Sequence, residues 1–340
     1  MRRRPRKSAW AKLFERGVAS ATRNVVAAGT RALQQAWAPA LARRAPPPGA
    51  GSWLPGLALG PAGARRFRLY RPSGLRFGDK LPLLVMLHGC GQDANSFATS
   101  TRMNRIAERE RFIVLYPEQD RLANAQGCWN WFDTARGRAQ AEAASILQAI
   151  DQVCLLHPVD RACIAVAGLS AGASMAALLV TRHPGRFKAV AMHSGIAPGA
   201  AHSSLSALRA MRGHRANPAL ATPAMASMPR VMAQDWPPLL VIHGAADRVV
   251  SPDNGPAAAA AWADAAGAHG GKARRVQRGQ RYPMTVTDFE HQGSRVATLV
   301  QIDRLAHAWS GGAATQPFGD PYGPDASRLV WAFAARRFAR

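Results

Sequence analysis

The chain has few acidic residues, few cysteines and no long apolar run, and each shortage excludes a class of protein. Its 340 residues contain 20 Asp and Glu against 44 Lys and Arg, a formal net charge of +24. The four cysteines form no Cys-x-x-Cys pair, so neither a zinc site nor a redox dithiol is expected. No apolar run approaches the length of a transmembrane helix. The rest of the composition, 48% hydrophobic and 19% charged, is typical of a globular protein with a substantial core.

Much of the positive charge lies at the start of the chain. Residues 1–50 hold eleven Lys and Arg residues and one acid, Glu15. Such an excess favours binding to anionic surfaces, although an Arg-rich proteome would explain it equally well. The sequence contains no helix-turn-helix, zinc-finger or RNA-binding aromatic pattern, so nucleic acid is not an expected partner.

Residues 1–51 are interpreted as a basic amphipathic leader followed by a Pro/Gly linker. Apolar residues recur near helical spacing, but Arg16, Arg23 and Arg31 interrupt the continuous apolar stretch that a secretory signal requires. A helix that lies on a surface and a partly disordered leader fit this pattern equally well. The folded domain is therefore expected to occupy residues 52–340.

Beyond the linker, apolar strands alternate with helices. Strands are predicted at 66–70, 83–87, 112–116, 163–167, 187–192, 239–242, 286–289 and 296–302, and helices at 139–153, 171–182, 257–266 and 326–338. This alternation predicts an α/β fold with a mostly parallel sheet covered by helices on both faces. Residues 196–236 break the pattern with many Ala, Pro and Met residues. They are interpreted as a lid-like insertion, with a packed helical excursion as the alternative.

The most informative stretch is RACIAVAGLSAGA, at residues 161–173. An apolar strand runs into Gly-Leu-Ser-Ala-Gly and then directly into an Ala-rich helix. A nucleophile on such a sharp turn needs small neighbours, because the strand, the turn and the helix approach closely. The helix beginning at Ala171 would also direct free N–H groups toward an oxyanion beside Ser170. Gly-x-Ser-x-Gly can arise by chance, but the strand–turn–helix context indicates that Ser170 is a nucleophile.

A nucleophilic serine needs a base and an acid that orients the base, and in this type of turn the acid and then the base follow in the chain. Asp247 comes shortly after the predicted strand 239–242 and is preferred as the acid over Asp253 and Asp303. His307 follows the last strand in a Gly-rich turn and is the candidate base.

The other nine histidines fit the base less well. His88 and His243 end predicted strands and are interpreted as structural supporting groups. His193 precedes the candidate acid in the chain, which is the wrong order. The remaining six fall in loops or polar stretches.

An oxyanion hole requires two preorganised backbone donors. One candidate is the N–H of Ala171, directly after the nucleophile. The other is the N–H of Cys90, in the loop that follows the strand at 83–87.

Taken together, these segments resemble the PHB depolymerase esterase family of α/β-hydrolases. The matching stretches are LVMLHGCGQ (84–92), MN (103–104), VLYPEQ (114–119), GCWNWF (127–132), AGLSAGA (167–173), AMHSG (191–195), residues 241–250, HAWSGG (307–312) and GPDASR (323–328). The resemblance spans residues 62–338 and implies an α/β-hydrolase catalytic domain that hydrolyses carboxylic esters. It implies that Ser170, Asp247 and His307 form the triad, and it suggests a disulfide between Cys90 and Cys128.

Three tryptophans lie near the expected site by their place in these motifs. Trp129, Trp131 and Trp309 could form an aromatic wall that binds an aliphatic chain or an aryl group. The alternative, that they pack loops onto the core, applies most directly to Trp131.

The family resemblance predicts a serine esterase that hydrolyses short-chain polyhydroxyalkanoate, poly(3-hydroxybutyrate) or its oligomers, without a metal or organic cofactor. A feruloyl or acetyl-xylan-type esterase is the alternative with the same triad. A third hypothesis is a non-catalytic granule- or nucleic-acid-binding protein on a hydrolase scaffold. The basic leader suggests docking onto a polymer granule or another anionic surface. We therefore expect a cytoplasmic, granule-associated protein, with secretion as the alternative.

Overall fold

The computed structural model describes residues 47–213 and 235–339. Most of the leader, residues 1–46, and the middle of the lid-like insertion, residues 214–234, lie outside the described residues. The first strand, β1 (Ser52–Gly60), starts at the residue where the sequence places the beginning of the folded domain.

The described residues form one eleven-stranded sheet and a short two-stranded one. The strands are β1 (Ser52–Gly60), β2 (Gly63–Arg71), β3 (Leu81–Leu87), β4 (Ile113–Pro117), β5 (Val159–Leu169), β6 (Ala189–His193), β7 (Leu239–Gly244), β8 (His269–Gly270), β9 (Arg274–Val276), β10 (Met284–His291), β11 (Ser294–Ile302), β12 (Trp309–Ser310) and β13 (Gly319–Asp320). The large sheet has the order β1-β2-β4-β3-β5-β6-β7-β11-β10-β8, with β9 on β10. Its centre, from β4 to β11, is parallel, whereas β1, β2 and β10 pair antiparallel. The predicted mostly parallel sheet is confirmed.

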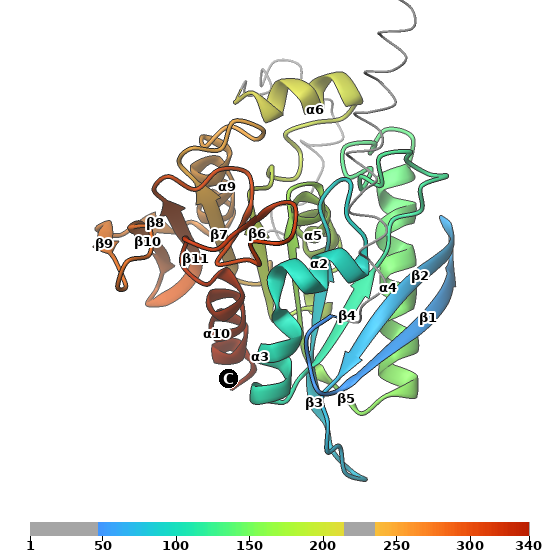
Figure 1. The fold of residues 1–340 in the computed structure, drawn as a ribbon. Coiled ribbons are helices and arrows are strands. Elements are labelled where there is room, and N and C mark those ends of the chain that lie inside the picture. Colours follow the sequence, from blue (N-terminus) through green and yellow to red (C-terminus); the bar gives the residue numbers. More distant parts are fainter. Residues whose placement is uncertain (1–46, 214–234, 340) are drawn as a thin grey trace, which may run out of the picture. The chain divides into compact units, whose positions relative to one another are not determined.

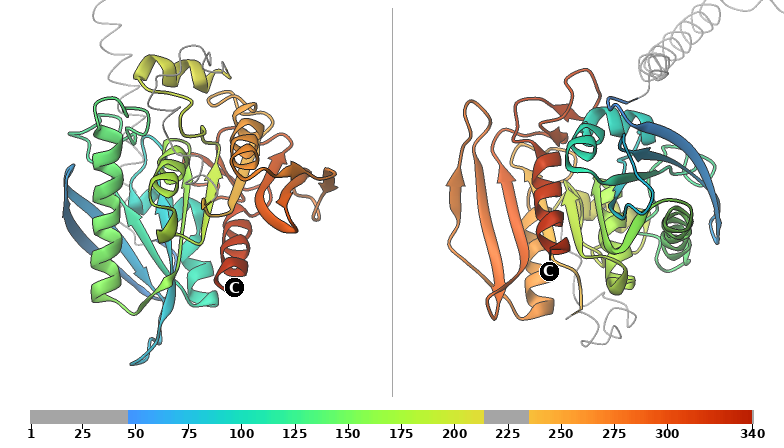
Figure 2. Two further views of the ribbon diagram at one scale, coloured as in Figure 1. Left: turned by 180° about the vertical axis from the view of Figure 1, so that it is seen from behind. Right: turned by 90° about the horizontal axis from the view of Figure 1, so that it is seen from below.

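Helices cover both faces of this sheet. They are α2 (Ala94–Thr101), α3 (Met103–Glu110), α4 (Arg138–Leu156), α5 (Ala171–Arg182), α6 (Ser204–Met211), α9 (Asn254–Ala266) and α10 (Ala326–Phe338), with a short 3₁₀ helix at Pro184–Arg186. Helices α2, α3 and α10 lie on the face toward the viewer in Figure 1. Helices α4, α5 and α9 cover the opposite face, which Figure 2 shows from behind. None of the helices in the described part of the chain is long and apolar enough to span a membrane.

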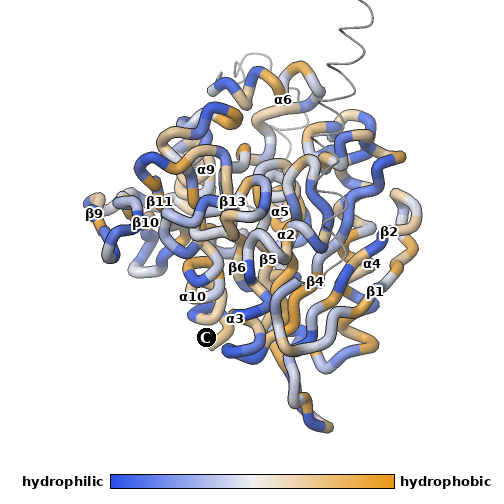
Figure 3. Tube along the Cα trace, viewed as in Figure 1, coloured by the Kyte–Doolittle hydropathy of each residue, from blue (hydrophilic) through white to orange (hydrophobic). Residues whose placement is uncertain are grey.

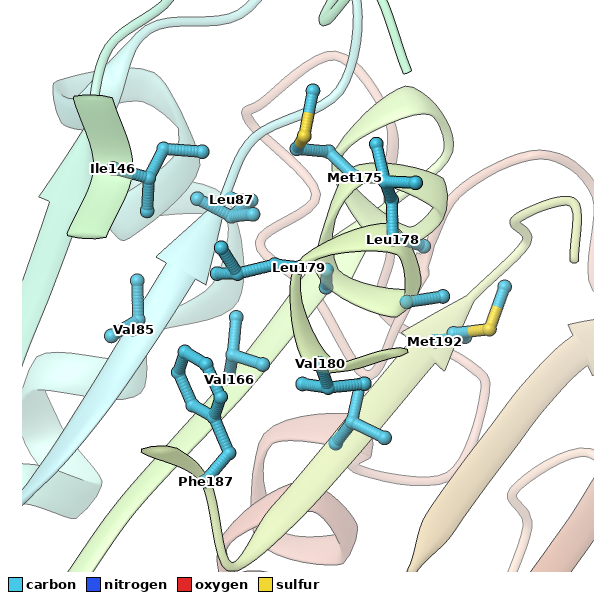
Figure 4. Close-up of a cluster of buried hydrophobic side chains, with 14 of the residues drawn as sticks. Val85, Leu87, Ile146, Val166, Met175, Leu178, Leu179, Val180, Phe187 and Met192 are labelled. Carbon is cyan, nitrogen blue, oxygen red and sulfur yellow. The ribbon is translucent and has the colours of Figure 1, made fainter. Parts of the chain in front are cut away.

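The central strands are buried on both sides and supply two separate cores. In β3, Val85 and Leu87 pack on the α4 and α5 face, whereas Leu84 and Met86 pack on the α2, α3 and α10 face. Successive side chains of a strand point to opposite faces, so a continuous apolar run fills both cores. Figure 3 shows this apolar stretch along the central strands, and Figure 4 shows Val85 and Leu87 near Leu179 of α5.

Several elements escaped the sequence analysis. The edge strand β1 (SWLPGLALG) contains Pro55 and Gly56, which are disfavoured inside strands and interrupt its apolar residues. Among the described strands it pairs with β2 alone, in a hairpin that sets Trp53 opposite Tyr70. The short helices α2 and α3 are separated by Arg102 alone, which adopts a left-handed conformation with φ 54°. A single non-glycine residue in that conformation gives little warning in the sequence.

Parallel pairing places the carboxyl ends of β3, β5, β7 and β11 along one edge of the sheet. At the end of β5 the backbone packs against its neighbours with no room for side chains. A Cβ at Gly172 would lie 2.1 Å from the carbonyl oxygen of Leu87, and a Cβ at Gly168 would lie 2.3 Å from the carbonyl carbon of Gly172. The glycines on both sides of Ser170 are therefore required by close backbone approach.

We expect Gly172→Ala to lower the free energy of unfolding by about 1 to 3 kcal/mol, because the new methyl group must displace the backbone at the end of β3. Urea denaturation measures this change. The matched control is Gly185→Ala, since a Cβ at Gly185 meets no atom within 4 Å. Equal stability of the two variants would contradict the steric explanation.

Candidate active site

Ser170 occupies a strained turn between β5 and α5. Its φ and ψ are 56° and −121°, a conformation that a non-glycine residue rarely adopts and that costs about 1 to 3 kcal/mol. The Ser170 N–H donates to the carbonyl oxygen of His193, 2.8 Å away, which ties the turn to the end of β6. Ser170 also lines a cavity of about 310 Å³. The structure thus presents this side chain at a cavity, as the sequence motif predicts.

Asp247 and His307 are brought together from positions 60 residues apart. His307 Nδ1 donates to Asp247 Oδ2 at 2.8 Å, and Asp247 Oδ1 accepts the N–H groups of Val249 and Val250, each at 2.9 Å. Burial raises the pKa of this carboxyl group, but the hydrogen bonds from His307 and the two backbone N–H groups outweigh burial and lower it below its usual value. The ionised carboxylate holds the proton of His307 on Nδ1 and leaves Nε2 available as a base.

The rival acids have other partners. Asp303 pairs with Arg275 at 2.6 Å, and Asp253 accepts a hydrogen bond from the Ser251 hydroxyl. Within residues 47–213 and 235–339, no hydrogen bond joins the Ser170 hydroxyl to His307. Such contacts are commonly long in unliganded hydrolases and tighten when substrate binds.

The residues that carry the two candidate oxyanion donors belong to the cavity lining. Ala171 and Cys90 line the cavity together with Ser170. In the described part of the chain, neither backbone N–H has a protein acceptor. Ala171 is the first residue of α5, so its N–H is one of the free donors at the positive end of the helix dipole.

The loop that carries Cys90 is attached to a second loop. Cys90 and Cys128 form a disulfide, as the family resemblance suggests. The indole Nε1 of Trp129 donates to the carbonyl oxygen of His88 at 3.0 Å. These two links fix the loop at Cys90 itself and at His88, two residues before it.

Two buried histidines also hold loops in place. His88 Nδ1 donates to the carbonyl oxygen of Gly89, so the neutral ring accepts the N–H of Gln119 at Nε2, 3.1 Å away. His193 accepts the N–H of Ser310 at Nε2 in the same way, at 3.1 Å. Burial lowers the pKa of His88 to about 4 and the pKa of His193 to about 3. The supporting role predicted for His88 matches this geometry, whereas the role of His193 was missed because its partner is distant in the sequence.

The three tryptophans divide between cavity and core. Trp129 and Trp131 line the cavity. Trp309 does not follow the expectation of a substrate-binding wall: it is not among the described residues that line the cavity, and it stacks on His193 and donates from Nε1 to the Ser327 hydroxyl. Trp309 follows His307 by two residues, and its side chain packs the loop of His307 onto the core.

The cavity is mainly apolar. Besides the residues named above, its described lining comprises Asn124, Gln126, Cys128, Phe132, Ser174, Ser194, Gly195, Ile196, Ser204, Ala207, Leu208, Met211 and Val250. No charged side chain occurs in this set. Helix α6, within the predicted lid-like insertion, supplies four of these residues and lies above the carboxyl ends of the strands in Figure 1. In the described part of the chain, no group of three or more His, Cys, Asp or Glu residues could hold a metal ion.

The pKa of His88 predicts an acid-sensitive fold. Between about pH 6.5 and pH 4 the unfolded chain binds a proton at this residue that the folded protein does not bind. The stabilisation is therefore complete above the unfolded pKa and declines as the pH falls, by about 3 kcal/mol in total. Urea denaturation over this pH range should show a steeper loss of stability for the wild type than for His88→Gln. Parallel pH profiles would contradict the neutral buried imidazole.

Comparison with known proteins agrees with this fold and sequence pattern. The chain is 33% identical over 189 residues to a poly(3-hydroxyalkanoate) depolymerase C of Paucimonas lemoignei, which covers 54% of this chain and 44% of that protein. It is 29% identical over 132 residues to feruloyl esterase B of Neurospora crassa, covering 38% of this chain and 44% of that protein. The chain thus spans less than half the length of both relatives.

Among solved structures, the acetyl xylan esterase from Aspergillus awamori superposes with a TM-score of 0.60 at 19% identity, over 76% of this chain and 94% of that one. This similarity confirms the α/β-hydrolase fold. The family model described as Esterase PHB depolymerase matches residues 65–278, more than half of the chain. The chain therefore belongs to the Esterase PHB depolymerase family.

Proposed function

We propose that this chain is a serine esterase that hydrolyses short-chain polyhydroxyalkanoate, namely poly(3-hydroxybutyrate) or its oligomers, through an acyl-enzyme. One observation carries the proposal. A strained serine lines an uncharged cavity together with two residues whose backbone N–H groups have no acceptor among the described residues, and the same sheet edge holds a paired aspartate and histidine.

In the first step, Ser170 attacks the ester carbonyl while its proton passes to Nε2 of His307. Asp247 stabilises the imidazolium through the hydrogen bond at Nδ1. The carbonyl oxygen becomes an oxyanion, and the N–H groups of Cys90 and Ala171 donate to it. One such donor contributes about 2.7 to 4 kcal/mol of transition-state stabilisation. His307 then returns its proton to the departing alkoxide, so that an alcohol leaves and an acyl-serine remains.

The second step reverses these roles with water as the nucleophile. His307 removes a proton from the water as it attacks the acyl carbon, and the same two N–H groups bind the new oxyanion. When this intermediate collapses, the proton moves from His307 to the Ser170 oxygen. A carboxylic acid leaves, and the enzyme returns to its starting state.

The substrate class is supported by the cavity and by the relatives. A 3-hydroxybutyrate unit within a polyester carries no charge, and the described cavity lining contains no charged side chain to pair with one. Its methyl and methylene groups suit an apolar lining of Trp129, Trp131 and Ile196. The relative with 33% identity is named for hydrolysis of this polymer class.

A feruloyl or acetyl-xylan ester is the second candidate substrate. Trp131 and Phe132 both line the cavity, and their rings lie 5.7 Å apart in an edge-to-face arrangement. Such a pair can pack against the aryl ring of a ferulate. A feruloyl esterase among the sequence relatives supports the same possibility.

The experiment compares hydrolysis of amorphous poly(3-hydroxybutyrate) granules with hydrolysis of methyl ferulate. We expect the wild type to release 3-hydroxybutyrate products, and Ser170→Ala to lower this rate by at least about 10⁴-fold, because no nucleophile remains. The rate is measured by chromatography of the soluble acids.

The control for folding is the unfolding transition of Ser170→Ala. The variant should be at least as stable against unfolding as the wild type. Turnover of ferulate alone would assign the protein to the plant-ester substrates. Equal polymer turnover by wild type and Ser170→Ala would refute the proposed nucleophile.

We further propose that the basic leader docks the enzyme onto the anionic surface of a polymer granule, which would place it in the cytoplasm. Residues 1–50 carry eleven basic residues and one acidic residue. Deletion of these residues should lower the granule-bound fraction in a sedimentation assay, and salt should weaken binding of the full chain, because the attraction is electrostatic. Unchanged sedimentation of the shortened chain would disprove the docking role.

A further inference from the structure

A buried carboxylate that takes no part in the proposed chemistry lies behind the oxyanion-hole loop. Glu142 in α4 is completely buried. In the described part of the chain it makes no hydrogen bond or ion pair with Asp247 or His307. We infer that Glu142 is a positioning residue that fixes the N–H of Cys90 for catalysis. The inference rests on the proposed function, since it concerns how the oxyanion hole of that reaction is held.

Three N–H groups from two loops converge on this carboxylate. Glu142 Oε1 accepts from Nε2 of Gln119 at 2.7 Å and from Nδ2 of Asn130 at 2.6 Å. Glu142 Oε2 accepts the backbone N–H of Asn130 at 2.9 Å. A carboxylate is an acceptor at both oxygens, so it can satisfy all three donors at once. A side-chain amide of the same size would turn an NH₂ group toward one of them.

Gln119 connects this carboxylate to a buried cation. Its Oε1 accepts from Nη1 of Arg65, while its Nε2 donates to Glu142. Arg65 also donates to the carbonyl oxygen of Glu118 and lies over the ring of Trp129, 5.2 Å from the centroid. The amide thus has one orientation, with oxygen toward the cation and nitrogen toward the anion. The opposite charges keep a carboxylate in the core without a direct ion pair.

Two connections lead from this cluster to the oxyanion donor. The Gln119 N–H donates to Nε2 of His88, two residues before Cys90, at 3.1 Å. The Gln119 side chain also donates to the carbonyl oxygen of Cys128 at 3.0 Å, and Cys128 is bonded to Cys90 through the disulfide. A displacement of Glu142 would therefore reach Cys90 by two routes, through the backbone at His88 and through the disulfide.

A role in fold stability alone explains this arrangement less well. Replacing buried ion networks by apolar side chains is often neutral or stabilising, so stability does not require one here. Among the described residues, the donors to Glu142 belong to Gln119 and Asn130. In the sequence these two residues stand on either side of Cys128 and Trp129, which line the cavity. Displacement of a reacting group by about 1 Å can cost about 100-fold in rate, so this fixation affects catalysis.

The test variant is Glu142→Gln, assayed in the full chain with p-nitrophenyl butyrate. We expect kcat to fall by about 10- to 100-fold while KM stays within about twofold, because an oxyanion donor acts in the transition state and not in the ground-state complex. Affinity for a trifluoromethyl ketone, whose hemiketal oxyanion would occupy the same site on Ser170, should fall by the same factor as kcat.

The matched control is Glu108→Gln. Glu108 is a carboxylate that accepts hydrogen bonds from Tyr70 and from Ser73 at the opposite end of the sheet. This variant should be destabilised and keep the wild-type kcat. If Glu142→Gln does not fold, Glu142→Asp provides the same comparison, since it retains the charge and withdraws it by one methylene. It should show a smaller loss of kcat, again with KM unchanged.

Amide hydrogen exchange separates this inference from the proposed function. Glu142→Gln should speed exchange in peptides covering residues 88–92 and 119–130, whatever ester the enzyme prefers and even if the wild type proves inactive. An inactive wild type would refute the proposed function alone. The positioning role would be overturned if these peptides exchanged at the wild-type rate in Glu142→Gln. It would also be overturned if Glu142→Gln were less stable than the wild type but kept the wild-type kcat and ketone affinity.

Discussion

The contact on which the site depends is the packing of three backbones at the end of β5. Gly172 lies so close to the carbonyl oxygen of Leu87 that a Cβ would be 2.1 Å away. This contact places the first turn of α5 directly beside the end of β3. It therefore brings the N–H of Ala171 and the loop of Cys90 to the same side of Ser170. The strained φ of Ser170 follows from the same constraint, because the chain must reverse within one residue.

Around this centre, loops are held by buried polar groups and not by apolar contact alone. His88 and His193 each use the lone pair of a neutral ring to accept a backbone N–H from a loop that starts elsewhere in the chain. Both rings are buried. A protonated ring would point an N–H group at the backbone N–H that it now accepts, and no solvent could reach the charge. Neutral imidazoles are thus part of the native geometry.

The sequence predicted the parts whose signals are local. The turn at Ser170 is recognisable from its glycines, the short loop after a predicted apolar strand favours Asp247, and the Gly-rich turn after the last strand favours His307. The remainder was not predictable because the decisive partners are far apart: His193 meets Ser310 across 117 residues. Trp309 shows the same limit, since its motif places it near the base, but only the packing of β6 and α10 shows that it faces inward. The edge strand β1 was missed because Pro55 and Gly56, which are disfavoured inside strands, interrupt its apolar residues.

The two candidate oxyanion donors are held in place by different physical means. The N–H of Ala171 is fixed by the regular hydrogen bonding of α5, which few single substitutions outside the elbow would disturb. The N–H of Cys90 belongs to an irregular loop whose position depends on a disulfide and side-chain contacts. Changes in the second loop, between residues 119 and 130, therefore alter two properties together, since that loop also lines the cavity. Under the proposed mechanism, substrate selection and oxyanion geometry are therefore coupled through this loop, whereas Ser170 and α5 lie outside it.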